Sequence, residues 1–187
     1  MSSEPVAHGG DLAGARRRYG ARDTGADDGW IDLSTGINPN PYPMEIPPRE
    51  AWARLPEQPA IAELERAAAK AYGVQSPEQV VAAPGTQALI QLLPRLMRTS
   101  RVAVLGPTYG EHAHVWRTAG HAVEDAKDFG DLDGADVAIV TNPNNPDGRL
   151  LDRPTLQSLV DRQTNNGGLV IIDEAFVDVA EEQSFAP

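Results

Sequence analysis

The stretch with the clearest chemistry is residues 168–178, which read GLVIIDEAFVD. Three consecutive β-branched residues at 170–172 indicate a strand buried on both faces. Asp173 follows directly, at the strand end where open α/β sheets bind their ligands. An isolated buried charge is strongly unfavourable, so Asp173 predicts a cationic or hydrogen-bonding partner. An ordinary acid that caps the next turn is the alternative.

A possible phosphate site comes earlier, in PGTQALI at residues 84–90. Gly85 lets the backbone approach a ligand closely, and a helix that starts at Thr86 presents free N–H groups and the positive end of its dipole. The stretch matches neither GxGxxG nor GxxxxGK[ST], which argues against a dinucleotide site and against a P-loop. A plain turn and helix cap is the other interpretation.

Two more loops carry polar or aromatic groups at strand ends. GPTYGEH, residues 106–112, contains Tyr109, whose ring can stack on a planar ligand. NPNNPDG, residues 142–148, combines two prolines that fix the backbone with the amides of Asn142, Asn144 and Asn145. Such a rigid turn favours a polar group held in a defined position.

Composition excludes several classes of function. The 187 residues carry a formal charge of −11, which makes nucleic acid an unfavourable partner. Without cysteine there is no disulfide, thiolate metal site or cysteine nucleophile, and no apolar run is long enough for a membrane span. These features predict a soluble, cytoplasmic protein. Only two of the 16 basic residues are lysines, Lys70 and Lys127, so lysine chemistry has few candidates.

The elements that must position these motifs alternate along the chain. Residues 1–58 form a Gly- and Pro-rich arm, with a helical run at 12–19 and a short strand at 30–33, and a helix follows at 59–72. After it, strands alternate with amphipathic helices, and no further helix or strand follows residue 173. This pattern predicts an α/β fold with a mostly parallel sheet between two helical layers. The expected strands are 79–83, 101–105, 121–124, 136–141 and 169–172, and the expected helices are 86–97, in which Pro94 kinks or shortens the helix, 110–119 and 154–164.

The order of these motifs resembles the large domain of pyridoxal-phosphate enzymes of the aspartate aminotransferase fold, fold type I. The resemblance covers about residues 60–178, and NPNNPDG followed by DEAF is its specific part. It implies an amino-terminal arm at 1–58 and a partial pyridoxal-phosphate-binding large domain at 59–187. The implied roles are the cofactor phosphate for Gly85, Thr86 and Gln87, the ring face for Tyr109, the phenolic oxygen for Asn145 and the pyridine nitrogen for Asp173.

The arm is similar to the cobalamin-pathway branch of the family. HGGD at 8–11 and IDLSTGINPNPYP at 31–43 carry this similarity, as does phenylalanine rather than tyrosine at Phe176. The branch contains threonine-phosphate decarboxylases, which form aminopropanol phosphate, and close kin that are histidinol-phosphate aminotransferases. The resemblance implies a phosphorylated amino acid as substrate, contacts to it from His8 and Asn38, and a homodimer at full length.

The chain also departs from the family. The lysine that binds the cofactor covalently in relatives lies beyond the position of Asp173, and neither Lys70 nor Lys127 matches it. The expectation is therefore an amino-terminal fragment, inactive by itself. Two other classes remain open: a non-catalytic module for phosphorylated ligands, and a phosphoryl hydrolase with Asp173 and Glu174 at a magnesium ion. The resemblance itself implies no metal.

Overall fold

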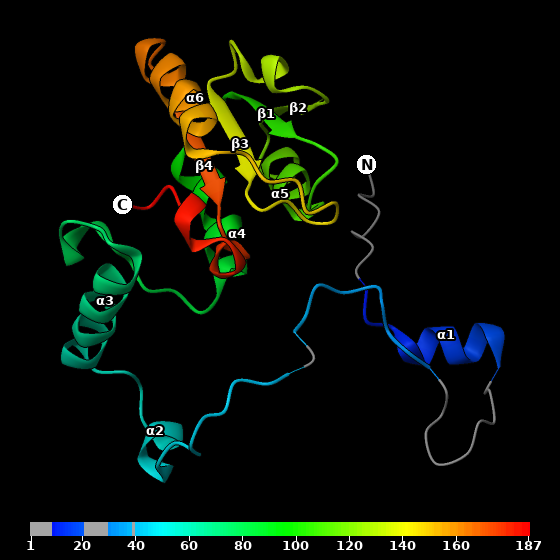
Figure 1. Ribbon diagram of the computed structural model, residues 1–187, viewed down its shortest axis with the longest axis vertical. Helices are drawn as coiled ribbons and strands as arrows, with labels where there is room; N and C mark the ends of the chain where they lie inside the picture. Colours follow the sequence, from blue (N-terminus) through cyan, green and yellow to red (C-terminus); the bar gives the residue numbers. More distant parts are fainter. Residues whose placement is uncertain (1–8, 21–29, 39) are drawn as a thin grey trace. The chain divides into compact units, whose positions relative to one another are not determined.

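The structure is a computed structural model that describes residues 9–20, 30–38 and 40–187, and it divides into two compact units, Met1–Pro43 and Met44–Pro187 (Figure 1). In the first unit, α1 (Leu12–Tyr19) begins at Asp11, whose side chain accepts a hydrogen bond from Gly14 N. The strand expected at 30–33 is wrong. The Asp32 carboxylate accepts a hydrogen bond from Ser34 N at 2.8 Å, and this turn interrupts an extended run.

The second unit begins with helices. α2 (Arg49–Ala53) follows two prolines, and the expected helix at 59–72 is confirmed as α3 (Gln58–Tyr72). α3 ends at Gly73, whose φ of 69° is left-handed and whose N–H bonds the last turn. The strand expected at 79–83 is wrong, because no described strand pairs with this segment and Val81 is 74% exposed. A short 3₁₀ turn, η1 (Pro77–Gln79), occupies its start.

The other four expected strands form one parallel sheet with the order β2-β1-β3-β4, which confirms the predicted parallel arrangement. Thr141 pairs with Asp173 at the carboxyl ends of β3 and β4. The loops that follow β1, β3 and β4 therefore meet at one edge of the sheet. The strands are β1 (Arg101–Leu105), β2 (Ala122–Ala126), β3 (Val137–Thr141) and β4 (Leu169–Asp173).

Helices cover both faces of this sheet. α4 (Thr86–Leu96) and α5 (Glu111–Thr118) contribute Leu93, Ala113 and Trp116 to the apolar cluster on one face. α6 (Arg153–Asn165) packs Leu156 and Leu159 on the other face, beside the turn η2 (Phe129–Leu132). Figure 1 shows α6 and α5 on opposite sides of the strands. Pro94 lies inside α4, and the helix ends two residues later, at Leu96.

The segment after β4 contains two 3₁₀ turns, η3 (Val177–Val179) and η4 (Glu181–Gln183), where no further helix was expected. Arg153 donates a hydrogen bond to Ser184 O at 2.6 Å, and the Glu174 carboxylate accepts one from Phe185 N at 2.7 Å. The first bond ties the segment to the start of α6, and the second closes the segment on itself. Among the helices of the described residues, none has the length and apolar character needed to cross a bilayer.

Candidate active site

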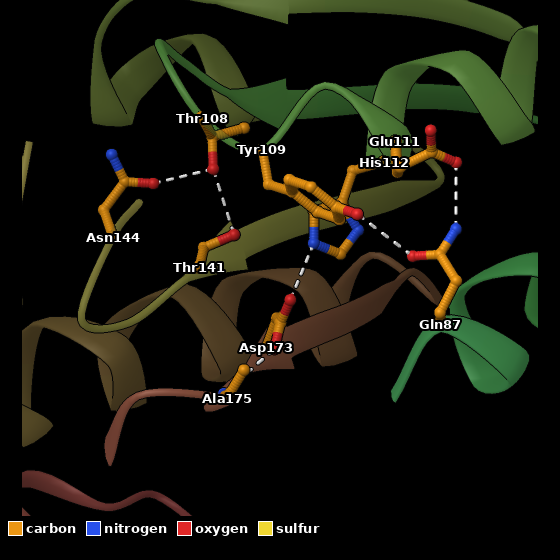
Figure 2. Close-up of polar contacts among 9 residues, drawn as sticks. All are labelled: Gln87, Thr108, Tyr109, Glu111, His112, Thr141, Asn144, Asp173 and Ala175. Atoms are coloured by element: carbon orange, nitrogen blue, oxygen red, sulfur yellow. Dashed lines mark hydrogen bonds and ion pairs between the residues drawn. The ribbon is translucent and has the colours of Figure 1, made fainter. Parts of the chain in front are cut away.

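Asp173 lies at the carboxyl end of β4 and faces His112, on the first turn of α5 (Figure 2). His112 Nε2 is 2.9 Å from Asp173 Oδ2, and the two side chains are only 3% and 8% exposed. The second oxygen, Oδ1, accepts a hydrogen bond from Ala175 N at 3.0 Å. The hydrogen-bonding partner that the sequence predicted for Asp173 is thus present, and it is His112.

These contacts keep the carboxylate charged. Burial acts to raise the pKa of Asp173, but the hydrogen bond from His112, the N–H of Ala175 and the charge of His112 outweigh it, so the pKa lies below its usual value. Asp173 is therefore an anion at neutral pH, although its side chain is almost fully buried. Such a group can stabilise a cation placed next to it.

Tyr109 lies beside this pair, on the loop after β1. Its ring meets the His112 ring edge-on, with 6.1 Å between centroids. Its hydroxyl donates to Gln87 Oε1 at 3.3 Å, and Gln87 Nε2 donates to Glu111 Oε2 at 2.9 Å. Burial, followed by the charges of Glu111 and Asp173, raises the pKa of Tyr109, so its hydroxyl stays protonated.

The NPNNPDG loop is held by its own asparagines. Asn144, 4% exposed, donates to Pro107 O at 2.8 Å and accepts from the Thr108 hydroxyl at 2.6 Å. Asn142 exchanges two hydrogen bonds with the Leu151 backbone. Among the described residues, the Asn145 side chain has no hydrogen-bond partner. Asn142 and Asn144 therefore support the loop, whereas the Asn145 amide takes no part in these bonds.

The Gly85 turn opens α4 at the same edge of the sheet. Gly85 has a φ of 83°, and a Cβ built on it meets no atom within 4 Å. Among the described residues no side chain caps the helix, and Ala88 N donates to Gly85 O, so the N–H groups of Thr86 and Gln87 are the ones available to an anion. Thr86 is exposed there, whereas the Gln87 side chain turns toward Tyr109.

The other two expected site residues, His8 and Asn38, belong to the arm. His8 lies outside the described residues. Asn38 belongs to the first unit, where its Oδ1 accepts a hydrogen bond from Asn40 N at 2.9 Å. Their expected contacts to a substrate remain predictions.

Sequence reasoning missed His112 and Glu111. The only signal in the sequence was that both residues stand at the start of the helix expected at 110–119, within three positions of Tyr109.

The magnesium alternative finds little support in the geometry. Glu174 accepts hydrogen bonds from the Ser184 hydroxyl and from Phe185 N, while Asp173 is engaged with His112. The two carboxylates therefore serve different partners. Within the described ranges, no three His, Asp or Glu side chains gather as a metal site would require.

A family model matches residues 30–187 and is described as aminotransferase class I and II. The chain belongs to this family. Its enzymes depend on pyridoxal phosphate.

The curated relatives that match the chain are of two kinds, threonine-phosphate decarboxylases and histidinol-phosphate aminotransferases. The chain is 44% identical to a threonine-phosphate decarboxylase from Sinorhizobium sp, over 98% of the chain and 54% of the relative. It is 46% identical to one from Pseudomonas aeruginosa, over 96% of the chain and 52% of the relative. Identity to a histidinol-phosphate aminotransferase from Mesorhizobium japonicum is 33%, over 83% and 46%. The chain thus spans about half the length of the curated relatives it matches.

A solved structure agrees with the fold. The L-threonine-O-3-phosphate decarboxylase from Porphyromonas gingivalis superposes with a TM-score of 0.56 at 26% identity, over 63% of this chain and 38% of that one. The parallel sheet of Figure 1 is therefore part of the fold-type I large domain, as the sequence predicted.

Proposed function

We propose that this chain is the part of a threonine-phosphate decarboxylase that binds pyridoxal phosphate and orients the substrate. The reaction releases the carboxyl group of threonine phosphate as carbon dioxide, and a proton takes its place on the α-carbon to give aminopropanol phosphate. The main support is the identity of 44–46% to two such decarboxylases over nearly the whole chain, against 33% to the aminotransferase.

The described residues fit the cofactor. Asp173 offers a carboxylate that is kept anionic, as a protonated pyridine nitrogen requires. The uncapped first turn of α4 suits a phosphate dianion, and Asn145 offers an unused amide for the phenolic oxygen. Tyr109 supplies an aromatic face at the end of β1. When bound, pyridoxal phosphate supplies a cationic ring that withdraws electrons from the substrate α-carbon.

The chain's own residues provide binding and electrostatics. His112 and the Ala175 N–H hold the Asp173 carboxylate in one orientation, so no reorganisation is needed when it pairs with a cation. The start of α4 would anchor the phosphate group, at the end of pyridoxal phosphate opposite its ring nitrogen. Asn144 and Thr108 fix the loop that carries Asn145. His8 and Asn38 are proposed to orient the substrate phosphate, which would choose the bond that breaks.

The test is a chimera in which residues 1–187 replace the matching half of the Pseudomonas aeruginosa relative. It is incubated with pyridoxal phosphate and threonine phosphate, and both carbon dioxide and aminopropanol phosphate are measured. We expect the two products in equal amounts. Consumption of 2-oxoglutarate with histidinol phosphate, without carbon dioxide, would instead establish the aminotransferase alternative.

The same chimera distinguishes the non-catalytic alternative. Pyridoxal phosphate that remains bound after dialysis, with neither product formed and no amino transfer, would indicate a module that binds the cofactor without chemistry. Two substitutions in the chimera, His8→Ala and Asn38→Ala, test the arm. We expect each to raise the KM for threonine phosphate more than it changes cofactor binding, because the proposed contacts are to the substrate.

A further inference from the structure

Glu111 is a carboxylate that the proposed reaction does not use, although it lies within the site (Figure 2). It stands on the first turn of α5 and is only 8% exposed. Its Oε2 accepts a hydrogen bond at 2.9 Å from Gln87 Nε2, which belongs to α4 and lies 24 positions earlier in the chain. A nearly buried acid beside an anion site lowers the affinity for a phosphate by repulsion. We therefore expect a contribution of Glu111 to the site that offsets this repulsion.

The contact with Glu111 decides how the Gln87 amide is oriented. An ionised carboxylate only accepts hydrogen bonds, so the NH₂ group of Gln87 must face Glu111. The amide oxygen then faces Tyr109, whose hydroxyl donates to it at 3.3 Å. With a neutral amide in place of Glu111, Gln87 can turn over and present NH₂ to the Tyr109 hydroxyl.

We propose that Glu111 is a positioning residue: through Gln87 it fixes the hydroxyl of Tyr109 as a donor and ties the start of α4 to the loop after β1. The proposal rests on the proposed function, in which Tyr109 lies against the cofactor ring and α4 holds the phosphate. It also gives Gln87 a new part. Its side chain is the bridge between the two anchors, and its backbone N–H remains for the phosphate.

Charge and positioning predict opposite effects on the cofactor, which makes the proposal testable. In Glu111→Gln, the loss of a negative charge alone would tighten the binding of the anionic pyridoxal phosphate. Loss of the fixed bridge would weaken it, and we expect the dissociation constant to rise roughly fivefold. The matched control is Glu124→Gln, which removes one charge from the exposed face of β2.

A second measurement needs no cofactor. The chain is labelled with ¹³Cζ-tyrosine, and the Tyr109 resonance, assigned by its loss in Tyr109→Phe, is followed at pH 7. The chemical shift of this carbon reports the hydrogen bond of the hydroxyl. We expect Glu111→Gln to move the resonance and Glu124→Gln to leave it in place. In a Gln87→Met background, Glu111→Gln should have little further effect, because the bridge is already gone.

The outcomes separate the two hypotheses. If the wild-type chain and the chimera both fail to bind pyridoxal phosphate, the cofactor assignment is wrong, and the resonance of Tyr109 alone decides the role of Glu111. The positioning role is overturned if Glu111→Gln binds the cofactor as tightly as wild type or more tightly. It is also overturned if Glu111→Gln moves the Tyr109 resonance by the same amount in the wild-type and the Gln87→Met backgrounds.

Discussion

His112 Nε2 and Asp173 Oδ2 lie 2.9 Å apart, and this contact joins the first turn of α5 to the end of β4. The bond needs only a proton on Nε2, which the neutral and the charged imidazole can both supply. It therefore holds the carboxylate in place whether or not His112 carries a charge. His112 and the N–H of Ala175 together hold the Asp173 carboxylate in one orientation and favour its charged form.

The first prediction concerns stability against pH. The pKa of Asp173 is lower in the folded chain than in the unfolded chain, so the unfolded state takes up the proton first as the pH falls. The carboxylate thus stabilises the fold above its unfolded pKa of about 3.9. This contribution is lost as the pH falls through the lower, folded value. Asp173→Asn should cost about 1 kcal/mol at pH 7 and much less near pH 3.

Urea unfolding of the 187-residue chain at both pH values measures this difference. The control is Asp178→Asn, an exposed acid for which a small and pH-independent change is expected. An equal loss of stability at pH 7 and pH 3 for Asp173→Asn would mean that its charge contributes nothing.

The second prediction tests whether Asp173 supports electron withdrawal by the cofactor ring or holds the cofactor in the site. In the chimera, Asp173→Ala should lower kcat by about 10²-fold to 10³-fold, because the anion opposite the ring nitrogen is removed. The phosphate anchor at α4 is untouched, so pyridoxal phosphate should still bind. Absorbance of the dialysed protein gives the cofactor content, and product formation gives the rate. Loss of cofactor and activity together would show that Asp173 is an anchor instead.

The third prediction isolates the phosphate turn. Gly85 and Gly134 have nearly the same φ, 83° and 81°, and a Cβ at either position meets open space. Substitution by alanine should strain the backbone similarly at both, at about 1 kcal/mol. Only Gly85→Ala places a methyl group at the proposed phosphate site. We expect weaker cofactor binding in Gly85→Ala alone, and similar binding in both variants would remove the phosphate role from this turn.

The sequence predicted the two inner strands well because β1 and β3 are buried on both faces and are apolar over most of their length. The pattern at 101–105 matches β1 to the residue, and both faces of that strand are covered by helices. The segments at 30–33 and 79–83 carry similar residues but pair with no described strand. Strand propensity reflects packing against neighbours, so a local pattern cannot show whether a neighbour exists.

The candidate site was predicted unevenly for a related reason. Asp173, Tyr109 and Asn145 stand at strand ends, where the topology alone brings them to one edge. The bond between His112 and Asp173 and the bond from Gln87 to Glu111 join residues that are 61 and 24 positions apart in the chain. Such contacts depend on how α5 packs on the sheet, and this packing cannot be read from the local sequence pattern.

The last prediction tests the close packing at the start of β4. A Cβ on Gly168 would lie 2.4 Å from Gln163 Oε1 and 3.2 Å from the carbonyl oxygen of Asp136. Gln163 is 2% exposed and its side chain donates a hydrogen bond to Leu132 O, so the side chain cannot move away freely. Gly168→Ala should therefore destabilise the fold by about 1–3 kcal/mol. Gly130→Ala, where a Cβ meets nothing within 4 Å, is the control.

A double-mutant cycle identifies the cause. If the clash with Gln163 is responsible, Gly168→Ala should cost markedly less in a Gln163→Ala background, because the obstructing amide is gone. Urea unfolding of the four proteins gives the coupling. If the cost of Gly168→Ala is unchanged, the destabilisation comes from the clash with the backbone carbonyl of Asp136. No side-chain substitution can remove that clash. In either case, pyridoxal phosphate binding by the chimera should stay at the wild-type level, since Gly168 lies at the opposite end of β4 from Asp173.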